Sequence, residues 1–147
     1  MVIIRNAIRD DIPSLTVLMY ELGYPTTEAE MQTRFDAISN HPDYRTLVAI
    51  TENREVAGMI GLVRCYFFEH NGLYIRIGAL VVSENYRNRA IGKKLMASAE
   101  IWAKENGANT ILINSSNREQ RTVAHAFYKS IGYEVKSSGF VKYLIEQ

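Results

Sequence analysis

The order of hydrophobic and polar positions predicts a strand and then a helix at the start of the chain. Residues 2–8 are rich in β-branched side chains, which favours a strand. A helix should begin after Asp11 and run to Leu22, with Pro13 in its first turn, where a missing N–H is tolerated. Apolar side chains recur there three and four positions apart and predict one buried stripe, formed by Ile12, Leu15, Leu18, Met19 and Leu22.

The next segment predicts a second helix followed by extended structure. Thr27 and Glu30 have the spacing of a capping box, which predicts the start of a helix that ends at Ser39. Residues 46–51 and 55–68 are two β-rich runs separated by a turn-like ENR. We therefore expect these two runs to form a hairpin.

Residues 73–82, LYIRIGALVV, predict a further strand with an interruption. Two-residue alternation places Leu73, Ile75, Ile77, Ala79 and Val81 on one face. Gly78 lies inside this strand, and an interior glycine is typical of a bulge or of a close approach by another backbone. We expect one of these two features at Gly78.

A third helix is predicted over residues 90–106, with Gly107 as its stop. One face of this helix carries Ile91, Leu95, Ala99 and Trp102. Residues 110–115, TILINS, then predict another strand.

A fourth helix is predicted over residues 118–131, ending at Gly132. Its expected buried side chains are Val123, Ala126, Phe127 and Ile131. Residues 133–136 and 139–146 predict a terminal β-hairpin. The complete order, β-α-α-β-β-β-α-β-α-β-β, indicates a mixed α/β fold with helices on the faces of a sheet.

Length and composition limit the kind of protein this is. With 147 residues, 47% of them hydrophobic, and no linker, the chain is expected to form one domain over residues 1–147. The formal net charge of +1 disfavours broad nucleic-acid binding. A single cysteine, Cys65, excludes an internal disulfide framework, and its apolar neighbours predict a buried thiol. Without a long apolar run, we predict a soluble, cytoplasmic protein that does not enter a membrane.

The segment ENYRNRAIGKKL, residues 84–95, places four cations at the start of the third predicted helix: Arg87, Arg89, Lys93 and Lys94. A helix N-terminus carries a partial positive charge and unpaired N–H groups, so cations there repel it. A diphosphate would relieve this repulsion, because backbone amides and basic side chains both bind phosphate. The alternative is that the charges simply point into water. A dinucleotide fingerprint is excluded, because only Gly92 is present where three glycines are needed.

Two segments resemble the GCN5-related N-acetyltransferases (GNAT). RNRAIG, residues 87–92, is similar to the family's Arg/Gln-x-x-Gly-x-Gly/Ala segment, and AHAFYKSIGY, residues 124–133, is similar to its second signature. The family's first glycine is replaced by Ala90, which is tolerated if the backbone there is helical. The resemblance covers essentially the whole chain and implies a mixed, mostly antiparallel sheet flanked by helices.

The resemblance also implies acetyl-coenzyme A (acetyl-CoA) as cosubstrate. The fourth strand would pair with the pantetheine arm at Leu80, Val81 and Val82. The residues implied at the diphosphate are Arg87, Asn88, Arg89, Ala90, Ile91, Gly92, Lys93 and Lys94. Arg121 either contacts the cofactor's phosphates or caps the fourth helix.

Arg121, His125 and Tyr128 are expected to share one face of the fourth helix. The resemblance implies that Tyr128 protonates the departing thiolate, a suitable task for a phenol of pKa about 10. The competing interpretation is a half-buried aromatic side chain that covers the sheet edge. His125 is interpreted as structural or close to the cofactor. No second histidine has metal-ligand spacing, so no metal site is predicted.

The reaction predicted is direct attack of a primary amine on acetyl-CoA in a ternary complex, with the oxyanion near backbone N–H groups of residues 80–82. A general base is missing, because the strand over residues 73–82 contains no carboxylate. Possible substitutes are Glu21, Tyr24, Glu69 and His70. A non-catalytic acyl-CoA sensor on the same fold is therefore the alternative.

The acceptor is predicted to be a small molecule that binds near residues 20–44 and 66–74. The layout resembles acetyltransferases of the aminoglycoside and aminoalkylphosphonate types, and Arg76 favours an acidic acceptor. A peptide or protein amine remains an alternative. A homodimer, with the terminal hairpin as its contact, is also predicted.

Overall fold

The computed structural model describes residues 1–87, 90–114, 122–136 and 139–145, which form parts of two compact units, Met1–Ile113 and Asn114–Gln147. The strands are β1 (Ile3–Asn6), β2 (Tyr44–Ile50), β3 (Val56–Tyr66), β4 (Leu73–Val82) and β5 (Thr110–Ile113). The helices are α1 (Ile12–Leu22), α2 (Glu28–Ser39), α3 (Ile91–Glu105) and α4 (Thr122–Ser130), with short 3-10 turns at η1 (Arg9–Asp11) and η2 (Glu84–Tyr86).

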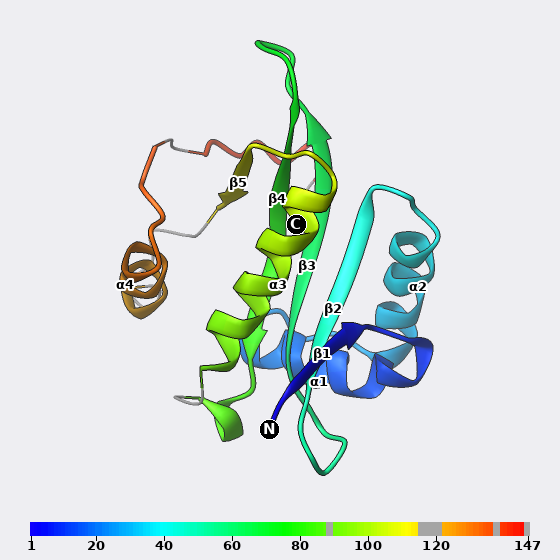
Figure 1. Ribbon diagram of the computed structural model, residues 1–147. Coiled ribbons are helices and arrows are strands. Elements are labelled where there is room, and N and C mark those ends of the chain that lie inside the picture. Colours follow the sequence, from blue (N-terminus) through cyan, green and yellow to red (C-terminus); the bar gives the residue numbers. More distant parts are fainter. Residues whose placement is uncertain (88–89, 115–121, 137–138, 146–147) are drawn as a thin grey trace. The chain divides into compact units, whose positions relative to one another are not determined.

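The first unit contains a five-stranded sheet in the order β1-β2-β3-β4-β5. Strands β1 to β4 pair antiparallel, and β5 pairs parallel with β4. Helix α3 covers one face, and α1 and α2 lie on the other (Figure 1). The predicted mixed, mostly antiparallel sheet with helices on its faces is confirmed.

Local sequence signals explain where α1 and α2 begin and end. Helix α1 has Pro13 in its first turn and ends at Gly23, whose φ of 106° is the left-handed conformation that glycine adopts easily. At the start of α2, the Thr27 hydroxyl accepts a hydrogen bond from the Glu30 N–H, and the Glu30 carboxylate accepts one from the Thr27 N–H, both at 3.1 Å. The predicted capping box is therefore formed.

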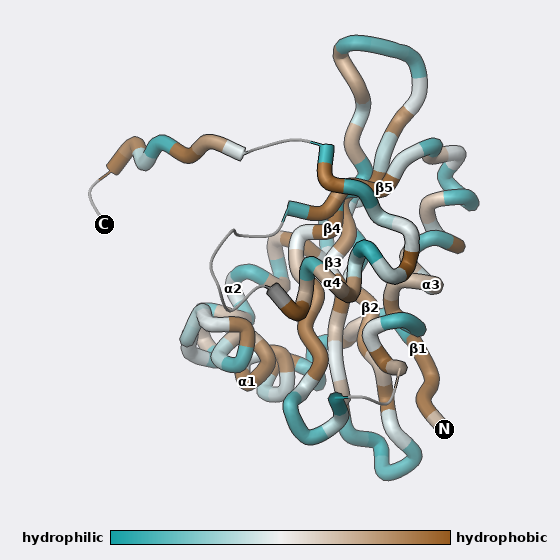
Figure 2. The backbone as a smooth tube through the Cα atoms, turned by 90° about the vertical axis from the view of Figure 1, so that its left-hand side faces the viewer, coloured by the Kyte–Doolittle hydropathy of each residue, from teal (hydrophilic) through white to brown (hydrophobic). Residues whose placement is uncertain are grey.

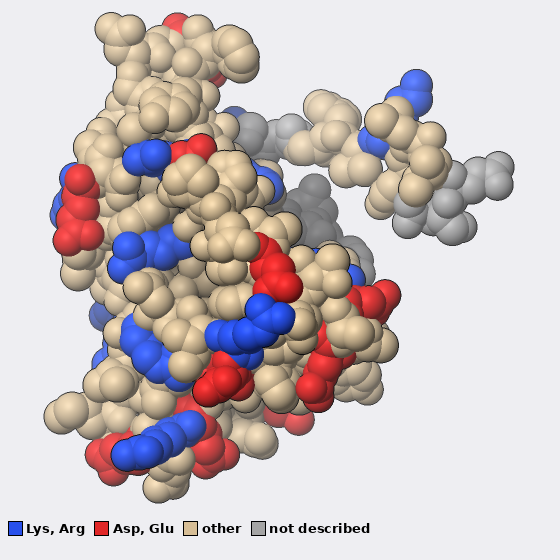
Figure 3. Space-filling view, turned by 90° about the vertical axis from the view of Figure 1, so that its right-hand side faces the viewer, with Lys and Arg blue, Asp and Glu red and all other residues tan. Residues whose placement is uncertain are grey.

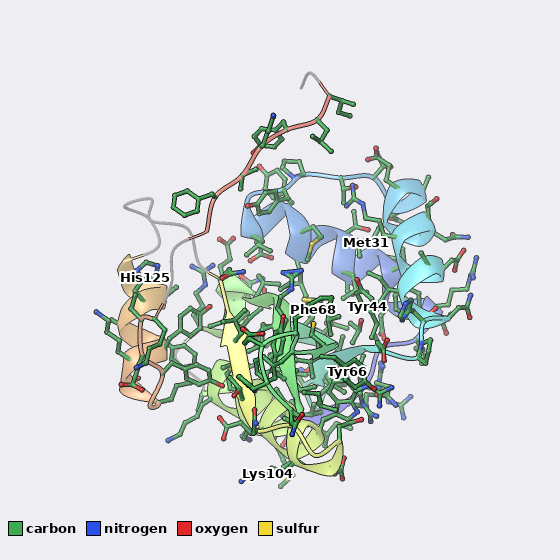
Figure 4. All side chains as sticks on the ribbon, turned by 90° about the horizontal axis from the view of Figure 1, so that it is seen from above. Met31, Tyr44, Tyr66, Phe68, Lys104 and His125 are labelled. Atoms are coloured by element: carbon green, nitrogen blue, oxygen red, sulfur yellow. The ribbon has the colours of Figure 1, made fainter. Side chains whose placement is uncertain are left out.

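The sheet is covered by apolar side chains on both faces. Toward α1 and α2, one buried cluster contains Ile12, Leu15, Leu18, Met31, Phe35, Val48, Ile50, Met59 and Val81. Met31, labelled in Figure 4, belongs to this layer. The buried residues of α3 are Ile91, Leu95, Met96, Ala99 and Ala103. Figure 2 shows the central strands mainly in hydrophobic colours and most connecting turns in hydrophilic ones.

Strand β4 contains a bulge at Gly78. Gly61 of β3 is opposite Ala79, but the next residue, Leu62, is opposite Ile77, so Gly78 is an extra residue in β4. The prediction of a bulge is confirmed. A close backbone approach occurs instead at Gly58, where an added Cβ would lie 2.9 Å from the Val81 carbonyl oxygen.

The bulge changes which face of the sheet the side chains of β4 reach. Residues opposite each other in an antiparallel pair point to the same face, so Ile77 lies on the side of Leu62 and Ala79 on the side of Gly61. Ile75 and Ile77 therefore face α3, whereas Ala79 and Val81 pack toward α1 and α2. The prediction of one shared face was wrong, because simple alternation does not continue through a bulge.

The second unit contains α4 and the terminal segment. Helix α4 ends before Gly132, whose φ is 97°, as predicted. Phe127 and Ile131 are half-buried, but Val123 is 81% exposed and Ala126 is also exposed, so the predicted stripe of four buried side chains is only half correct. Residues 118–121 of the predicted helix lie outside the described part of the chain.

The predicted terminal hairpin is not formed by the residues described there. Residues 133–136 and 139–145 contain no strand. Two strands alone are only marginally stable unless they bury one face, and here the apolar side chains are exposed. The exposed side chains are Val135, Phe140, Val141, Tyr143, Leu144 and Ile145. No helix among the described residues is long and apolar enough to cross a membrane.

Candidate functional site

The first part of the candidate site is the edge of β4 that faces β5. On its other edge β4 pairs with β3 along its length, but β5 pairs only with Tyr74–Ile77. Among the described residues, no strand pairs with residues 79–82 on the β5 side. The bulge at Gly78 thus separates a doubly paired half of the strand from a half with backbone groups available to an extended ligand.

The predicted pantetheine-binding residues, Leu80, Val81 and Val82, all lie in this second half of β4. Leu80 and Val82 are half-buried and face α3, because their partners on β3 are Ile60 and Gly58. The Val81 side chain is 5% exposed and lies in the core toward α1 and α2. Any contact from Val81 to a ligand would therefore come from its backbone.

The second part of the site is the start of α3. Its N-cap residue is Ala90, which provides no side-chain hydrogen bond, and the first helical bond runs from the Lys94 N–H to the Ala90 carbonyl at 3.1 Å. The amides of Ile91, Gly92 and Lys93 precede that bond and have no acceptor within the helix. An anion placed there would accept hydrogen bonds from these N–H groups and would be attracted by the helix dipole.

The conformation of Ala90 differs from our expectation. The sequence argument required a helical backbone at this position, but Ala90 has φ 60° and ψ 19°, in the left-handed region. A β-carbon in this conformation is strained by about 1 kcal/mol. The glycine of the family segment would fit here without strain, so the alanine is accommodated at an energetic cost.

Three of the predicted cations are described by the structure, and all three are exposed: Arg87, Lys93 and Lys94. Arg87 Nε makes a long contact of 3.5 Å to the Val82 carbonyl, and no carboxylate pairs with these three cations among the described ion pairs. On the face shown in Figure 3, basic and acidic side chains are interspersed. Asn88, Arg89 and Arg121 lie outside the described residues.

The loop between β4 and α3 is fixed at its root. Ser83 is 6% exposed, and its N–H donates to the Ala57 carbonyl of β3 at 2.8 Å. The Tyr86 N–H donates to the Ser83 carbonyl at 2.9 Å. Sequence reasoning missed Ser83, although a small polar residue directly after a strand is a common signal for a cap or turn.

Two of the four candidate bases lie in the turn between β3 and β4. Glu69 and His70 are both exposed, and the His70 ring stacks against Phe67 with ring centroids 3.9 Å apart. The other two are at the end of α1. Tyr24 is 56% exposed, and the Glu21 carboxylate accepts a hydrogen bond from the Glu84 N–H at 2.8 Å. The structure therefore brings Glu21 into contact with the loop between β4 and α3.

The third part of the site lies on β3 and on the half of β4 that precedes the bulge, whereas the open edge lies in the half that follows it. Cys65 is opposite Tyr74, and Val63 is opposite Arg76, on the sheet face that also carries α1 and α2. Arg76 is exposed. Tyr66 and Phe68, labelled in Figure 4, are 64% and 107% exposed at the end of this hairpin.

Tyr74 is half-buried beside Cys65 and Phe67. Burial raises the pKa of the Tyr74 phenol, the neighbouring Cys65 thiol adds to this, and the Arg76 charge opposes it. The Phe67 ring lies 4.7 Å from the Tyr74 ring, centroid to centroid. Tyr74 is therefore a neutral hydrogen-bonding group and a poor proton acceptor at neutral pH. Cys65 is half-buried, where we expected it to be buried.

Tyr128 lies in α4, in the second unit. Its half-buried ring is 5.7 Å from the Phe127 ring and 6.4 Å from the Tyr133 ring, centroid to centroid. His125 is one turn earlier and also half-buried. The proton-donor role of Tyr128 stays a prediction. Among the described residues, no group of three or more histidine, cysteine or acidic side chains could hold a metal.

An open strand edge beside an uncapped, basic helix start is suited to an extended anionic ligand, and acetyl-CoA is the ligand that the resemblance to the GNAT segments implies. A model of the acetyltransferase (GNAT) family matches residues 10–133. The chain is 32% identical over 144 residues to aminoalkylphosphonate N-acetyltransferase of Salmonella typhimurium, covering 96% of this chain and 90% of that one. It is 28% identical over 103 residues to a probable glucosamine 6-phosphate N-acetyltransferase of Drosophila melanogaster, covering 69% of this chain and 45% of that one.

A solved structure supports the same assignment. The crystal structure of a GNAT family acetyltransferase from Staphylococcus aureus has a TM-score of 0.82 and 34% identity, with 97% of this chain and 98% of that chain covered. The chain belongs to the GNAT family. It is an N-acetyltransferase with acetyl-CoA as its cosubstrate, and the alternative of a non-catalytic sensor is disfavoured.

Proposed function

We propose that this enzyme acetylates the primary amine of a small molecule that also carries a phosphonate or phosphate group. The observation that carries the proposal is Arg76, an exposed guanidinium on the α1 and α2 face of β4, two residues before the bulge. Arginine binds such anions through two parallel hydrogen bonds. The names of the two relatives, which specify an aminoalkylphosphonate and a sugar phosphate, support an anionic acceptor.

The cosubstrate would occupy the other side of the bulge. The amides of residues 91–93, with Lys93, Lys94 and Arg87, are suited to the diphosphate, and the backbone of residues 80–82 to the pantetheine arm. Both sets of groups fit an extended anionic thioester, because the edge of β4 is open and the start of α3 has no cap.

The transfer forms one C–N bond and breaks one C–S bond. The amine nitrogen attacks the thioester carbonyl, the thiolate leaves and takes up one proton, and the amine nitrogen loses one. We assign the donated proton to Tyr128 and the stabilisation of the oxyanion to a backbone N–H of residues 80–82. Cys65 has no covalent role in this scheme, so Cys65→Ala should retain activity.

The amine must lose a proton before it attacks, because an amine of pKa about 10.4 is less than about 0.1% neutral at pH 7. No carboxylate lies on β4. Of the four candidate bases, we favour Glu69 or His70 acting through water, since both are exposed in the turn that leads into β4, whereas the Glu21 carboxylate already accepts the hydrogen bond from the Glu84 N–H.

The acceptor class can be tested by measuring thiol release from acetyl-CoA. Aminoalkylphosphonates and glucosamine 6-phosphate should be better acceptors than their uncharged analogues and than aminoglycosides. Arg76→Ala should raise KM for the anionic acceptor by roughly 30-fold, the loss of a bidentate charged contact, and leave KM for acetyl-CoA unchanged. Arg45→Ala, which removes an exposed guanidinium from the α3 face of the sheet, opposite to the face of Arg76, is the control. Equal rates with charged and uncharged amines would contradict the proposal.

A further inference from the structure

Glu21 occupies an unfavourable position in α1. It lies in the last turn of the helix, where the dipole repels a carboxylate, and no basic residue lies in that turn to compensate. The helix ends directly afterwards, with the Tyr24 N–H donating to the Met19 carbonyl at 2.9 Å. A negative charge held at this end of α1 needs a contact that outweighs the repulsion.

That contact comes from a segment 63 residues further along the chain. Glu21 Oε1 accepts a hydrogen bond of 2.8 Å from the Glu84 N–H. Glu84 is the first residue of η2, directly after Ser83, which is its N-cap. Its N–H has no acceptor within that short turn, and a carboxylate is a strong acceptor for it. Three residues later the chain reaches Arg87, and then Ala90 at the start of α3.

We propose that Glu21 is a positioning residue that couples the acceptor side of the enzyme to its cofactor loop, of which residues 83–87 carry the contacts to α1 and β3. The Ser83 contact to Ala57 fixes the root of this loop on the sheet, and the Glu21 contact ties the next residue to α1. The same end of α1 carries Tyr20 and Tyr24, which are 69% and 56% exposed next to the predicted acceptor region. This inference rests on the proposed function for the acceptor side.

The coupling predicts that each substrate strengthens the binding of the other through the bond between Glu21 and Glu84. By linkage, the factor must be the same in both directions. A bound acceptor that orders the end of α1 holds the Glu21 carboxylate in place for the Glu84 N–H. In the other direction, bound coenzyme A orders the loop and holds the Glu84 N–H in place for Glu21. Removal of either partner should weaken both affinities without slowing the chemical step.

The experiment measures coenzyme A binding by calorimetry, with and without an aminoalkylphosphonate, together with steady-state kinetics. Glu21→Ala should weaken coenzyme A binding about tenfold, as expected for a charge-assisted hydrogen bond, and Glu21→Gln about threefold, since its amide oxygen still accepts. Glu105→Ala removes a carboxylate from the last turn of α3 and is the matched control. In each Glu21 variant, kcat should change less than threefold.

The donor of this hydrogen bond, the Glu84 N–H, can also be removed. Glu84→Pro deletes the N–H, and the extended conformation of Ser83, with φ −56° and ψ 138°, is compatible with a following proline. Glu84→Pro should weaken coenzyme A binding as much as Glu21→Ala, and the double variant should show no additional loss.

Two outcomes would overturn the inference. The first is unchanged coenzyme A affinity in Glu21→Ala. The second is a loss of kcat of a hundredfold or more in Glu21→Gln, with a changed acidic limb of the pH profile and unchanged coenzyme A affinity, which would identify Glu21 as the general base. If no amine is acetylated but the variants lose coenzyme A affinity as expected, the proposed acceptor is wrong and the role of Glu21 in the loop stands.

Discussion

Helices α2 and α3 begin in opposite ways. At α2, Thr27 is extended, with φ −101° and ψ 161°, and it exchanges two hydrogen bonds with Glu30. Acidic residues lie in the first turn of α2, where the dipole favours them. At α3, Ala90 is left-handed and offers no cap, and the first turn contains no acidic residue.

The difference shows that a helix start can be satisfied by its own sequence or left for a ligand. The start of α2 needs nothing further, because Thr27 and Glu30 satisfy each other's backbone N–H groups. The start of α3 presents unpaired amides and cations directly after the open half of β4. An uncapped start alone would be weak evidence, and its combination with that open edge supports a binding site.

The largest expected effect is the loss of ligand binding at the α3 start. Arg87→Glu should weaken coenzyme A binding by roughly 30-fold or more, because it replaces an attraction to the diphosphate by a repulsion. The unliganded protein should keep its melting temperature, since Arg87 is exposed and makes only a long contact. Calorimetry and thermal unfolding with and without coenzyme A check both statements.

The matched control for this prediction is Arg34→Glu, which makes the same charge change at an exposed position of α2. It should leave the coenzyme A affinity unchanged. If both variants lose affinity equally, the effect arises from net charge, and the α3 start is not a specific site.

The next effect concerns stability at the α2 start. Thr27→Ala removes the side-chain acceptor for the Glu30 N–H and should lower the free energy of unfolding by about 1 kcal/mol. Coenzyme A affinity should not change, because this helix start lies outside the cofactor site. Urea unfolding measures the first quantity and calorimetry the second. A loss of coenzyme A affinity in this variant would break the distinction between the two helix starts.

A smaller effect is expected at Ala90. Ala90→Gly removes left-handed strain of about 1 kcal/mol, and the freedom of glycine in the unfolded chain offsets part of it, so stability should rise by roughly 0.5 kcal/mol. The reverse change, Gly107→Ala at φ 75°, has open space around the new Cβ and should be destabilising through strain alone. Urea unfolding of both variants tests the assignment, and a destabilised Ala90→Gly protein would contradict it.

The smallest effect is a dependence on pH at the α2 start. The pKa of Glu30 is lowered, first by the hydrogen bond from the Thr27 N–H and then by the Thr26 and Thr27 hydroxyls. Because the pKa is lowered in the folded state, the Glu30 carboxylate contributes its full stabilisation above the ordinary glutamate pKa of about 4.3. This stabilisation is lost as the pH falls through the lower pKa of the folded state. The stability difference between the wild type and Glu30→Ala should therefore shrink in acid. A difference that stays constant would contradict the role of the charge.

Sequence patterns predicted those features that depend on near neighbours. The stripe of α1, the capping box at Thr27 and the bulge at Gly78 each follow from residues within one or two turns of helix or a few positions of strand. The cation cluster at the α3 start was recognised for the same reason, because its charges are adjacent in the chain.

Features that depend on distant pairing were not predictable in this way. The change of face after Gly78 follows from the register with β3, and the bond between Glu21 and Glu84 joins residues far apart in the chain. The left-handed conformation of Ala90 is a property of the backbone at the turn, and alanine itself gives no signal for it. The terminal segment, residues 139–145, has a strand-like pattern, but the pattern cannot specify a pairing partner.

The bulge also determines which kinds of mutation β4 can accept. An added Cβ at Gly78 would lie 3.9 Å from the Gly61 carbonyl, an ordinary contact, so Gly78→Ala should be tolerated locally. Deletion of residue 78 would leave Ile77 opposite Leu62 and Ala79 opposite Gly61, so both layers would keep their side chains and only the bulge would be lost. Deletion of a paired residue such as Leu80 would instead move Val81 to the α3 face and out of the layer beneath α1 and α2, so the tolerance of β4 to a deletion depends on whether the lost residue is the bulge.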